Sequence, residues 1–142
     1  MNAHLPKLAV TLAVSVASGL FVAGAAFGME YKVKLTGNQE VPPVQTPAAG
    51  NGTITVNDNE SVTGSIMTSG IKATAAHIHA GAAGKNGPVV IPLEKKSDNE
   101  FVVPAGAKLS DAQYKELKAG NLYVNVHSEM HKDGEIRAQL KP

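Results

Sequence analysis

Apolar and polar residues alternate along most of the chain with a period of two. Residues 31–35, Tyr-Lys-Val-Lys-Leu, show the pattern, and residues 53–56 repeat it. Successive side chains of a strand point to opposite faces, so this alternation predicts half-buried strands. The expected strands cover residues 31–35, 53–56, 62–68, 73–79, 89–93, 101–103, 122–127 and 135–140.

One segment carries the signature of a helix. Ser110 is followed three positions later by Gln113, which is a capping box, and Gly120 is well placed to end the helix. Three prolines in residues 41–47 predict an ordered loop, because proline lacks the backbone donor of a central strand. Short strands joined by closely spaced turns predict an all-β fold, an antiparallel Greek-key-like β-sandwich with one short helix.

The N-terminal segment has the features of a signal peptide. Lys7 precedes a largely apolar run over residues 8–22, and Ala26-Phe27-Gly28 supplies small residues for cleavage. We expect residues 1–28 to be removed, leaving one domain over residues 29–142 that is periplasmic or secreted. No later apolar run is long enough to span a membrane, so no span is expected after cleavage.

The charge and the cysteine content of the chain exclude several classes of function and covalent modification. Lys7 is the only charged residue of the first 28, so the remaining chain holds 12 basic and 12 acidic residues. These charges are interspersed along the chain, which argues against a nucleic-acid partner. The absence of cysteine excludes a disulfide framework and a lipid-modified cysteine.

Four of the five histidines fall in two short clusters, which makes metal binding the leading interpretation. His77 and His79 share one face of a strand, and an extended second cluster places His127, Glu129 and His131 on one face. Imidazole suits copper, zinc, iron or nickel, and copper stands highest for the same nitrogen ligands. The thioether of Met130 would favour reduced copper, although alternation gives Met130 the opposite parity to His127. Histidines that are merely solvated or hydrogen-bonded remain the alternative.

Three further residues are candidates for supporting roles around such a site. Asn125 has the parity of His127 and would fix its tautomer by a hydrogen bond. Arg137 either extends over its neighbours at the surface or pairs with Glu129 or Glu135 across the last hairpin. The expected metal ligands are therefore His77, His79, His127, His131 and Met130, supported by Asn125, Glu129 and Arg137.

Several motifs in order resemble the CHRD domain, named after chordin. They are residues 40–43 (Glu-Val-Pro-Pro), 76–79 (Ala-His-Ile-His), 86–90 (Asn-Gly-Pro-Val-Val), 122–127 (Leu-Tyr-Val-Asn-Val-His) and 134–137 (Gly-Glu-Ile-Arg). The resemblance runs from about Tyr31 to Leu140, with Ala138 where the family pattern has glycine. It implies an extracellular or periplasmic β-sandwich and supplies no catalytic residue list.

The His-x-His strand also looks, more distantly, like the copper-binding strand of copper-zinc superoxide dismutase. That enzyme needs further histidines, a zinc-binding carboxylate and a disulfide, and this chain has no cysteine. The hypothesis is a non-enzymatic, exported copper protein that binds Cu²⁺ or Cu⁺ and handles it or delivers it to a copper-protein partner. The alternatives are a protein- or ligand-binding module with incidental histidines, and a weak redox enzyme of the dismutase type. The sequence leaves the oligomeric state open.

Overall fold

The computed structural model describes Gly19 and residues 27–142. The predicted signal peptide, residues 1–28, lies outside the described residues apart from Gly19, Phe27 and Gly28. Within the described part of the chain, no helix is long and apolar enough to cross a membrane.

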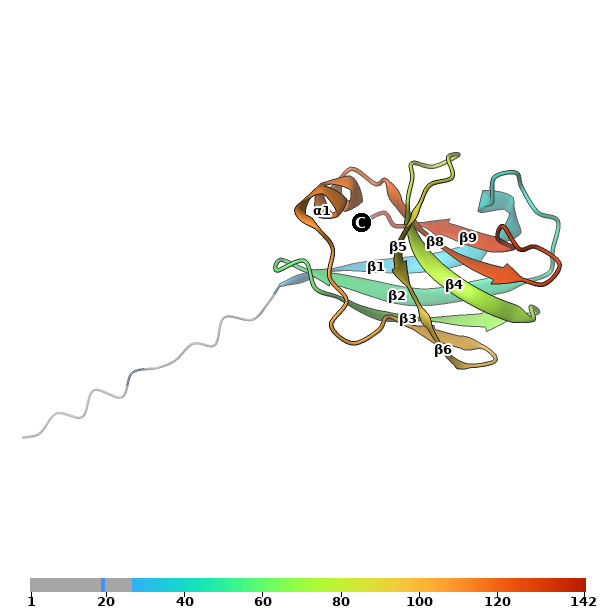
Figure 1. The fold of residues 1–142 in the computed structure, drawn as a ribbon, viewed down its shortest axis with the longest axis horizontal. Coiled ribbons are helices and arrows are strands. Elements are labelled where there is room, and N and C mark those ends of the chain that lie inside the picture. Colours follow the sequence, from blue (N-terminus) through green and yellow to red (C-terminus); the bar gives the residue numbers. More distant parts are fainter. Residues whose placement is uncertain (1–18, 20–26) are drawn as a thin grey trace, which may run out of the picture.

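Nine antiparallel strands form one sheet among the described residues (Figure 1). The strands are β1 (Gly28–Thr36), β2 (Ala49–Asn57), β3 (Val62–Ser69), β4 (Ala73–Ala80), β5 (Val89–Pro92), β6 (Glu94–Ser97), β7 (Glu100–Val102), β8 (Leu122–Ser128) and β9 (Ile136–Gln139). One α-helix, α1 (Asp111–Lys118), and one 3-10 turn, η1 (Gly37–Gln39), complete the fold. All the expected strands are present, and the all-β prediction with one short helix is confirmed.

The sheet is rolled up until its two ends meet. Its strand order is β5-β4-β8-β9-β1-β2-β3-β7-β6, so β4 lies beside β8 and β3 beside β7 through long connections. The two terminal strands, β5 and β6, are consecutive in the chain and are separated only by Leu93. The Leu93 amide donates to the carbonyl of Ala76 in β4 at 2.9 Å, which continues the β4–β5 pairing up to the start of β6. The result is a nearly closed barrel.

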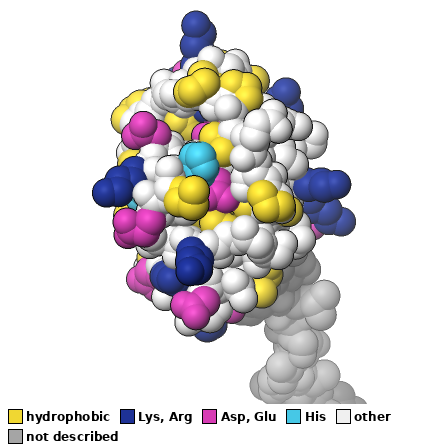
Figure 2. Space-filling model, turned by 90° about the vertical axis from the view of Figure 1, so that its right-hand side faces the viewer, with side chains coloured by type: hydrophobic (Ala, Val, Ile, Leu, Met, Phe, Trp, Pro, Cys, Tyr) yellow, Lys and Arg dark blue, Asp and Glu magenta, His cyan; other side chains and the backbone are white. Residues whose placement is uncertain are grey.

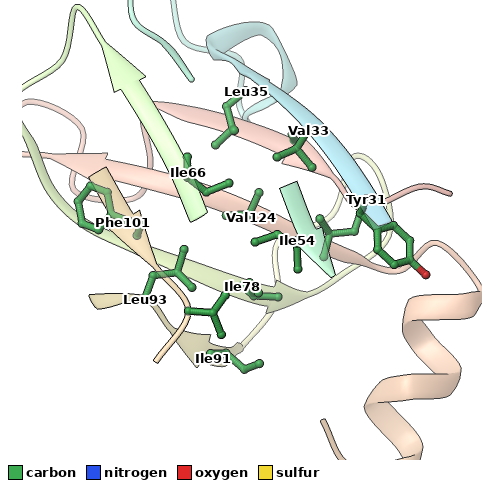
Figure 3. Close-up of a cluster of buried hydrophobic side chains, with 14 of the residues drawn as sticks. Tyr31, Val33, Leu35, Ile54, Ile66, Ile78, Ile91, Leu93, Phe101 and Val124 are labelled. Carbon is green, nitrogen blue, oxygen red and sulfur yellow. The ribbon is translucent and has the colours of Figure 1, made fainter. Parts of the chain in front are cut away.

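Alternation fills the inside of this barrel with apolar side chains. In β1, Tyr31, Val33 and Leu35 are buried while the residues between them are exposed. Figure 3 shows these three side chains converging with Ile54, Ile66, Ile78, Phe101 and Val124 from other strands. Burial of this apolar surface supplies the main stabilisation of the fold.

Helix α1 follows the capping prediction. The Ser110 side chain accepts from the Gln113 amide, and the Gln113 side chain accepts from the Ser110 amide. Gly120 adopts a φ of 80° directly after the helix, a conformation that glycine takes without strain. The helix buries Leu117 against the core at the end of the barrel where β1 begins (Figure 1).

The outer face of β4, β8 and β9 is also covered, and this face holds the candidate site. Residues 81–88, between β4 and β5, fold over it, as do residues 40–48, between η1 and β2. The Asn86 side chain donates to the carbonyl of Val41 at 2.8 Å and so ties the two loops together. In β8 both faces are therefore shielded, and only His127 is less than fully buried. Polar residues on this face lie inside the molecule.

Candidate metal centre

Three histidines meet on the covered outer face. His77 and His79 lie on β4 and His127 lies on the neighbouring β8, where it pairs in register with Ala75. Each ring contributes one nitrogen to a group whose members all lie within 4.8 Å of one another. The closest pair, His77 Nδ1 and His127 Nε2, is 2.9 Å apart. Two imidazole nitrogens each about 2 Å from one ion lie about 3 Å apart, so this spacing suits a shared metal.

Backbone carbonyls orient two of the three rings. His79 Nδ1 donates to the carbonyl of Gly87 at 2.9 Å, and His127 Nδ1 donates to the carbonyl of Lys132 at 2.7 Å. A carbonyl only accepts, so each Nδ1 carries a proton, and in the neutral form of each ring the lone pair is on Nε2. Metal-binding histidines typically have their other ring nitrogen held in this way. The two rings are thus prepared to act as ligands through Nε2.

The third ring completes the arrangement. With the lone pair of His127 on Nε2, His77 Nδ1 is the donor of the hydrogen bond between these two atoms. His79 Nε2 is buried and has no hydrogen-bond partner. An unpaired buried acceptor costs about 1–3 kcal/mol, and a metal ion would satisfy it. The donor set is three neutral nitrogens, which fits copper and zinc.

Electrostatics favour the uncharged form of His77 and His79. Burial, together with smaller effects of the neighbouring His127 and His79 in the same sense, lowers the pKa of His77 to about 4. Burial also lowers the pKa of His79, against the raising effect of its bond to Gly87. Protons therefore compete weakly with a metal for these two nitrogens at neutral pH.

The His79 ring is packed in a stack with the side chains of Tyr123 and Arg137. The His79 ring lies parallel to the Tyr123 ring with centroids 4.8 Å apart, and the Arg137 guanidinium lies 3.4 Å from the Tyr123 centroid. The Tyr123 hydroxyl accepts from the Gly87 amide at 3.0 Å. The residue that orients His79 is thus held by the side chain that stacks on it.

The structure does not bring His131 and Met130 to this cluster. The prediction that Glu129 and His131 share the face of His127 is wrong, because β8 ends at Ser128. The chain then turns, and the amides of Ser128 and His131 donate to one another's carbonyls. Met130 is 86% exposed, and Glu129 is exposed beside it. Figure 2 shows this end of the barrel, where a histidine side chain reaches the surface among hydrophobic and acidic groups.

Asn125 and Arg137 both lie on the outer face, where their parity places them, but neither has the predicted role. Asn125 is buried and pairs with His77 in the strand register. The prediction that it fixes the tautomer of His127 is wrong, because the Lys132 carbonyl accepts from His127 Nδ1 and does so instead. Both interpretations of Arg137 are wrong: it is 1% exposed, and it donates to the carbonyls of Ala82 and Lys85. It pairs with neither Glu129 nor Glu135 because the 81–88 loop supplies its acceptors. Arg137 therefore fastens that loop over the site.

Sequence reasoning missed two buried residues of this face, Glu40 and Tyr123. Glu40 is 4% exposed, and burial raises its pKa to about 7 although the charge of Arg137 acts in the opposite sense. The only available signal for Glu40 was an acidic residue at the start of a proline-rich ordered loop. Alternation in residues 122–127 gives Tyr123 the outer face of its strand, and it gives no sign that this face is covered.

Comparison with known families agrees with this architecture. The model of the CHRD domain matches residues 31–140. The chain belongs to the CHRD domain family. The match begins within β1 and runs past the end of β9, so the histidine cluster lies wholly inside the CHRD domain. Neither the curated proteins nor the solved structures gave a match, and the likeness to copper-zinc superoxide dismutase gains no support.

Proposed function

We propose that this CHRD domain is an exported, non-enzymatic copper-binding protein that handles copper or delivers it to another copper protein. The observation that carries the proposal is the group formed by His77, His79 and His127, in which two rings are oriented by carbonyls and His79 Nε2 lacks a partner. Copper is favoured over zinc because it stands higher in the Irving-Williams order for the same nitrogen ligands.

The donor set also supports handling of both oxidation states. Imidazole binds either Cu²⁺ or Cu⁺, and three nitrogens leave room for an exchanging ligand from a partner. His77 and His127 are half-buried, so the site lies close to the surface and within reach of a delivery partner. Met130 is not required for this role, because its side chain extends into solvent beyond the end of β8.

The first prediction concerns copper affinity, measured by competition calorimetry on untagged protein. We expect one Cu²⁺ per chain in the parent, and a loss of affinity of roughly 100-fold in His79→Ala and in His127→Ala, since each removes one oriented ligand. His131→Ala and Met130→Leu are the matched controls, and each is expected to stay within about threefold of the parent because neither residue reaches the cluster.

Two outcomes oppose the proposal. Unchanged affinity in His79→Ala and His127→Ala would remove the site, and a parent that binds no copper would leave the domain as a protein- or ligand-binding module. Superoxide turnover by the copper-loaded parent is expected to be negligible. Substantial turnover would replace the handling role by an enzymatic one.

A further inference from the structure

Buried polar atoms without a partner are concentrated beside the candidate metal centre. Among the described residues four side-chain atoms are buried and unpaired, and three of them are His79 Nε2, Asn125 Oδ1 and Glu40 Oε1. Such atoms are rare in folded proteins and call for an explanation. A metal ion accounts for His79 Nε2, but it leaves the Glu40 carboxyl unexplained.

Glu40 is separated from the candidate ligands by one side chain. Asn125 pairs in register with His77 on one side and with Arg137 on the other. A Cβ atom at Gly134 would lie 2.6 Å from both Asn125 Nδ2 and Glu40 Oε1. The amide of Asn125 and the carboxyl of Glu40 therefore face one another, with the histidines on the far side of Asn125.

The charge balance of this face is incomplete once a metal binds. The three histidine ligands are neutral, so a divalent ion adds two positive charges to a partly buried site. Arg137 already adds one, and it has no ion pair within 4 Å among the described residues. Uncompensated buried charge is unfavourable, and nearby opposite charge relieves it.

Glu40 is the acid placed to compensate. Glu135, the other buried acid, already accepts from Ser128 at 2.6 Å and from Thr46 at 2.8 Å. The remaining ionisable groups around Glu40 are His131, Lys132 and Asp133 in the 129–135 loop and Lys141 near the C-terminus. Lys132, Asp133 and Lys141 are exposed, so water screens them.

We propose that Glu40 is the counter-charge of the metal site: a neutral acid in the metal-free protein that releases its proton to solvent when a divalent ion binds. The bond that breaks is the O–H of the Glu40 carboxyl, and the resulting carboxylate balances one charge of the ion. Glu40 thereby favours Cu²⁺ over Cu⁺. This inference rests on the proposed copper site and adds the group that selects its oxidation state.

The ionisation of Glu40 in the metal-free protein agrees with this role. Burial raises the pKa of its carboxyl to about 7, so the acid is mostly protonated at pH 6. At pH 6 Glu40 therefore has a proton to release when a metal binds.

Calorimetric proton counting tests the inference. Cu²⁺ is titrated into the parent and into Glu40→Gln at pH 6, in weakly coordinating buffers with different ionisation enthalpies. The parent is expected to release about one proton more than Glu40→Gln, and the variant to lose about tenfold in Cu²⁺ affinity but less than about threefold in Cu⁺ affinity. Glu129→Gln, the same change at an exposed acid, is expected to match the parent in all three measurements.

An infrared measurement on the parent protein tests the same inference without the Glu40→Gln variant, so its result does not depend on whether that variant folds. The parent is expected to show the C=O stretch of a protonated carboxyl at pH 6, and this band should disappear on addition of Cu²⁺. Cu²⁺ binding with no loss of the band, or equal proton release by parent and Glu40→Gln, would overturn the role of Glu40 and leave the copper site intact. A parent that binds no Cu²⁺ overturns the proposed function itself.

Discussion

At the level of single residues, Arg137 and Tyr123 hold the 81–88 loop in place over the candidate site. The guanidinium stacks on the Tyr123 ring, and its Nη1 and Nη2 atoms donate to Asn86, Ala82 and Lys85. A planar guanidinium makes several directed bonds and a stacking contact at once, which an ammonium group does not. One side chain of β9 thus holds the loop whose Gly87 carbonyl orients His79.

The buried carboxyl of Glu40 gives metal-free stability a distinctive pH dependence. A pKa raised from 4.5 to about 7 contributes stability that is present below pH 4.5 and is lost as the pH rises through 7. The lowered pKa of His77 acts in the opposite direction, because its contribution is present above pH 6.5 and is lost as the pH falls through about 4. Between pH 4.5 and 6.5 the two effects oppose one another.

Replacement of Glu40 by glutamine should separate these effects. From pH 4.5 to pH 7 the free energy of unfolding of metal-free Glu40→Gln is expected to rise by about 2–3 kcal/mol relative to the parent, because glutamine does not ionise. Urea denaturation at a series of pH values measures it. Parallel pH profiles for the two proteins would show that Glu40 is not held neutral by burial.

Single residues also show that the alternation of apolar and polar residues predicts the face of a strand on which a side chain lies, but not whether a loop covers that face. The pattern placed His77, His79 and His127 correctly, because strand parity is local. It put Arg137 on the outer face, which is correct, but it gave no sign that the 81–88 loop closes over that face. Glu40 was beyond reach for the same reason: its burial depends on contacts with β8 and β9 that are distant in sequence.

At the scale of elements, the 81–88 loop determines the geometry of the site. A Cβ atom at Gly87 would lie 1.6 Å from the carbonyl oxygen of Ala80, so the loop requires glycine there. The Gly87 amide and carbonyl bond to Tyr123 and His79 respectively. A side chain at position 87 would push the backbone away from both rings.

Gly87→Ala is therefore expected to lower the free energy of unfolding by about 2 kcal/mol or more and to weaken Cu²⁺ binding at least about tenfold. Gly84→Ala is the matched control in the same loop. A Cβ there would meet nothing within 4 Å, and the φ of 78° at Gly84 leaves only a backbone penalty of about 1 kcal/mol. Thermal unfolding and competition calorimetry measure both effects. Equal copper affinity in Gly87→Ala and the parent would show that the loop does not set the His79 ring.

The sequence predicts those strands that alternate apolar and polar residues, and it misses a strand that has no apolar residue. Strands with one face in the core were identifiable, but β6 was not, since all four of its residues are exposed and polar. Strand β6 pairs with β7, which follows it directly in the chain. The end of β8 at Ser128 was also missed, and that error placed His131 and Glu129 in the site.

At the scale of the whole molecule, export is the property that the proposed function requires. Strand β1 begins at Gly28, the residue after which cleavage is predicted, so removal of residues 1–28 leaves the buried part of this strand intact. Intact-mass measurement of protein recovered from outside the cytoplasm is expected to show a chain that begins at or near Met29. A full-length, membrane-retained species would contradict the export prediction.

The junction at Leu93 bears on how readily the protein would aggregate at high concentration. An open sheet ends in two rows of unpaired amides and carbonyls that can recruit strands from other molecules. Here the terminal strands of the sheet are only four residues each, and both belong to the segment that joins the two ends. Pro92 removes a donor from one strand, and Lys95 and Lys96 place charges on the other. The fold therefore offers little template for intermolecular strand pairing and amyloid-like assembly.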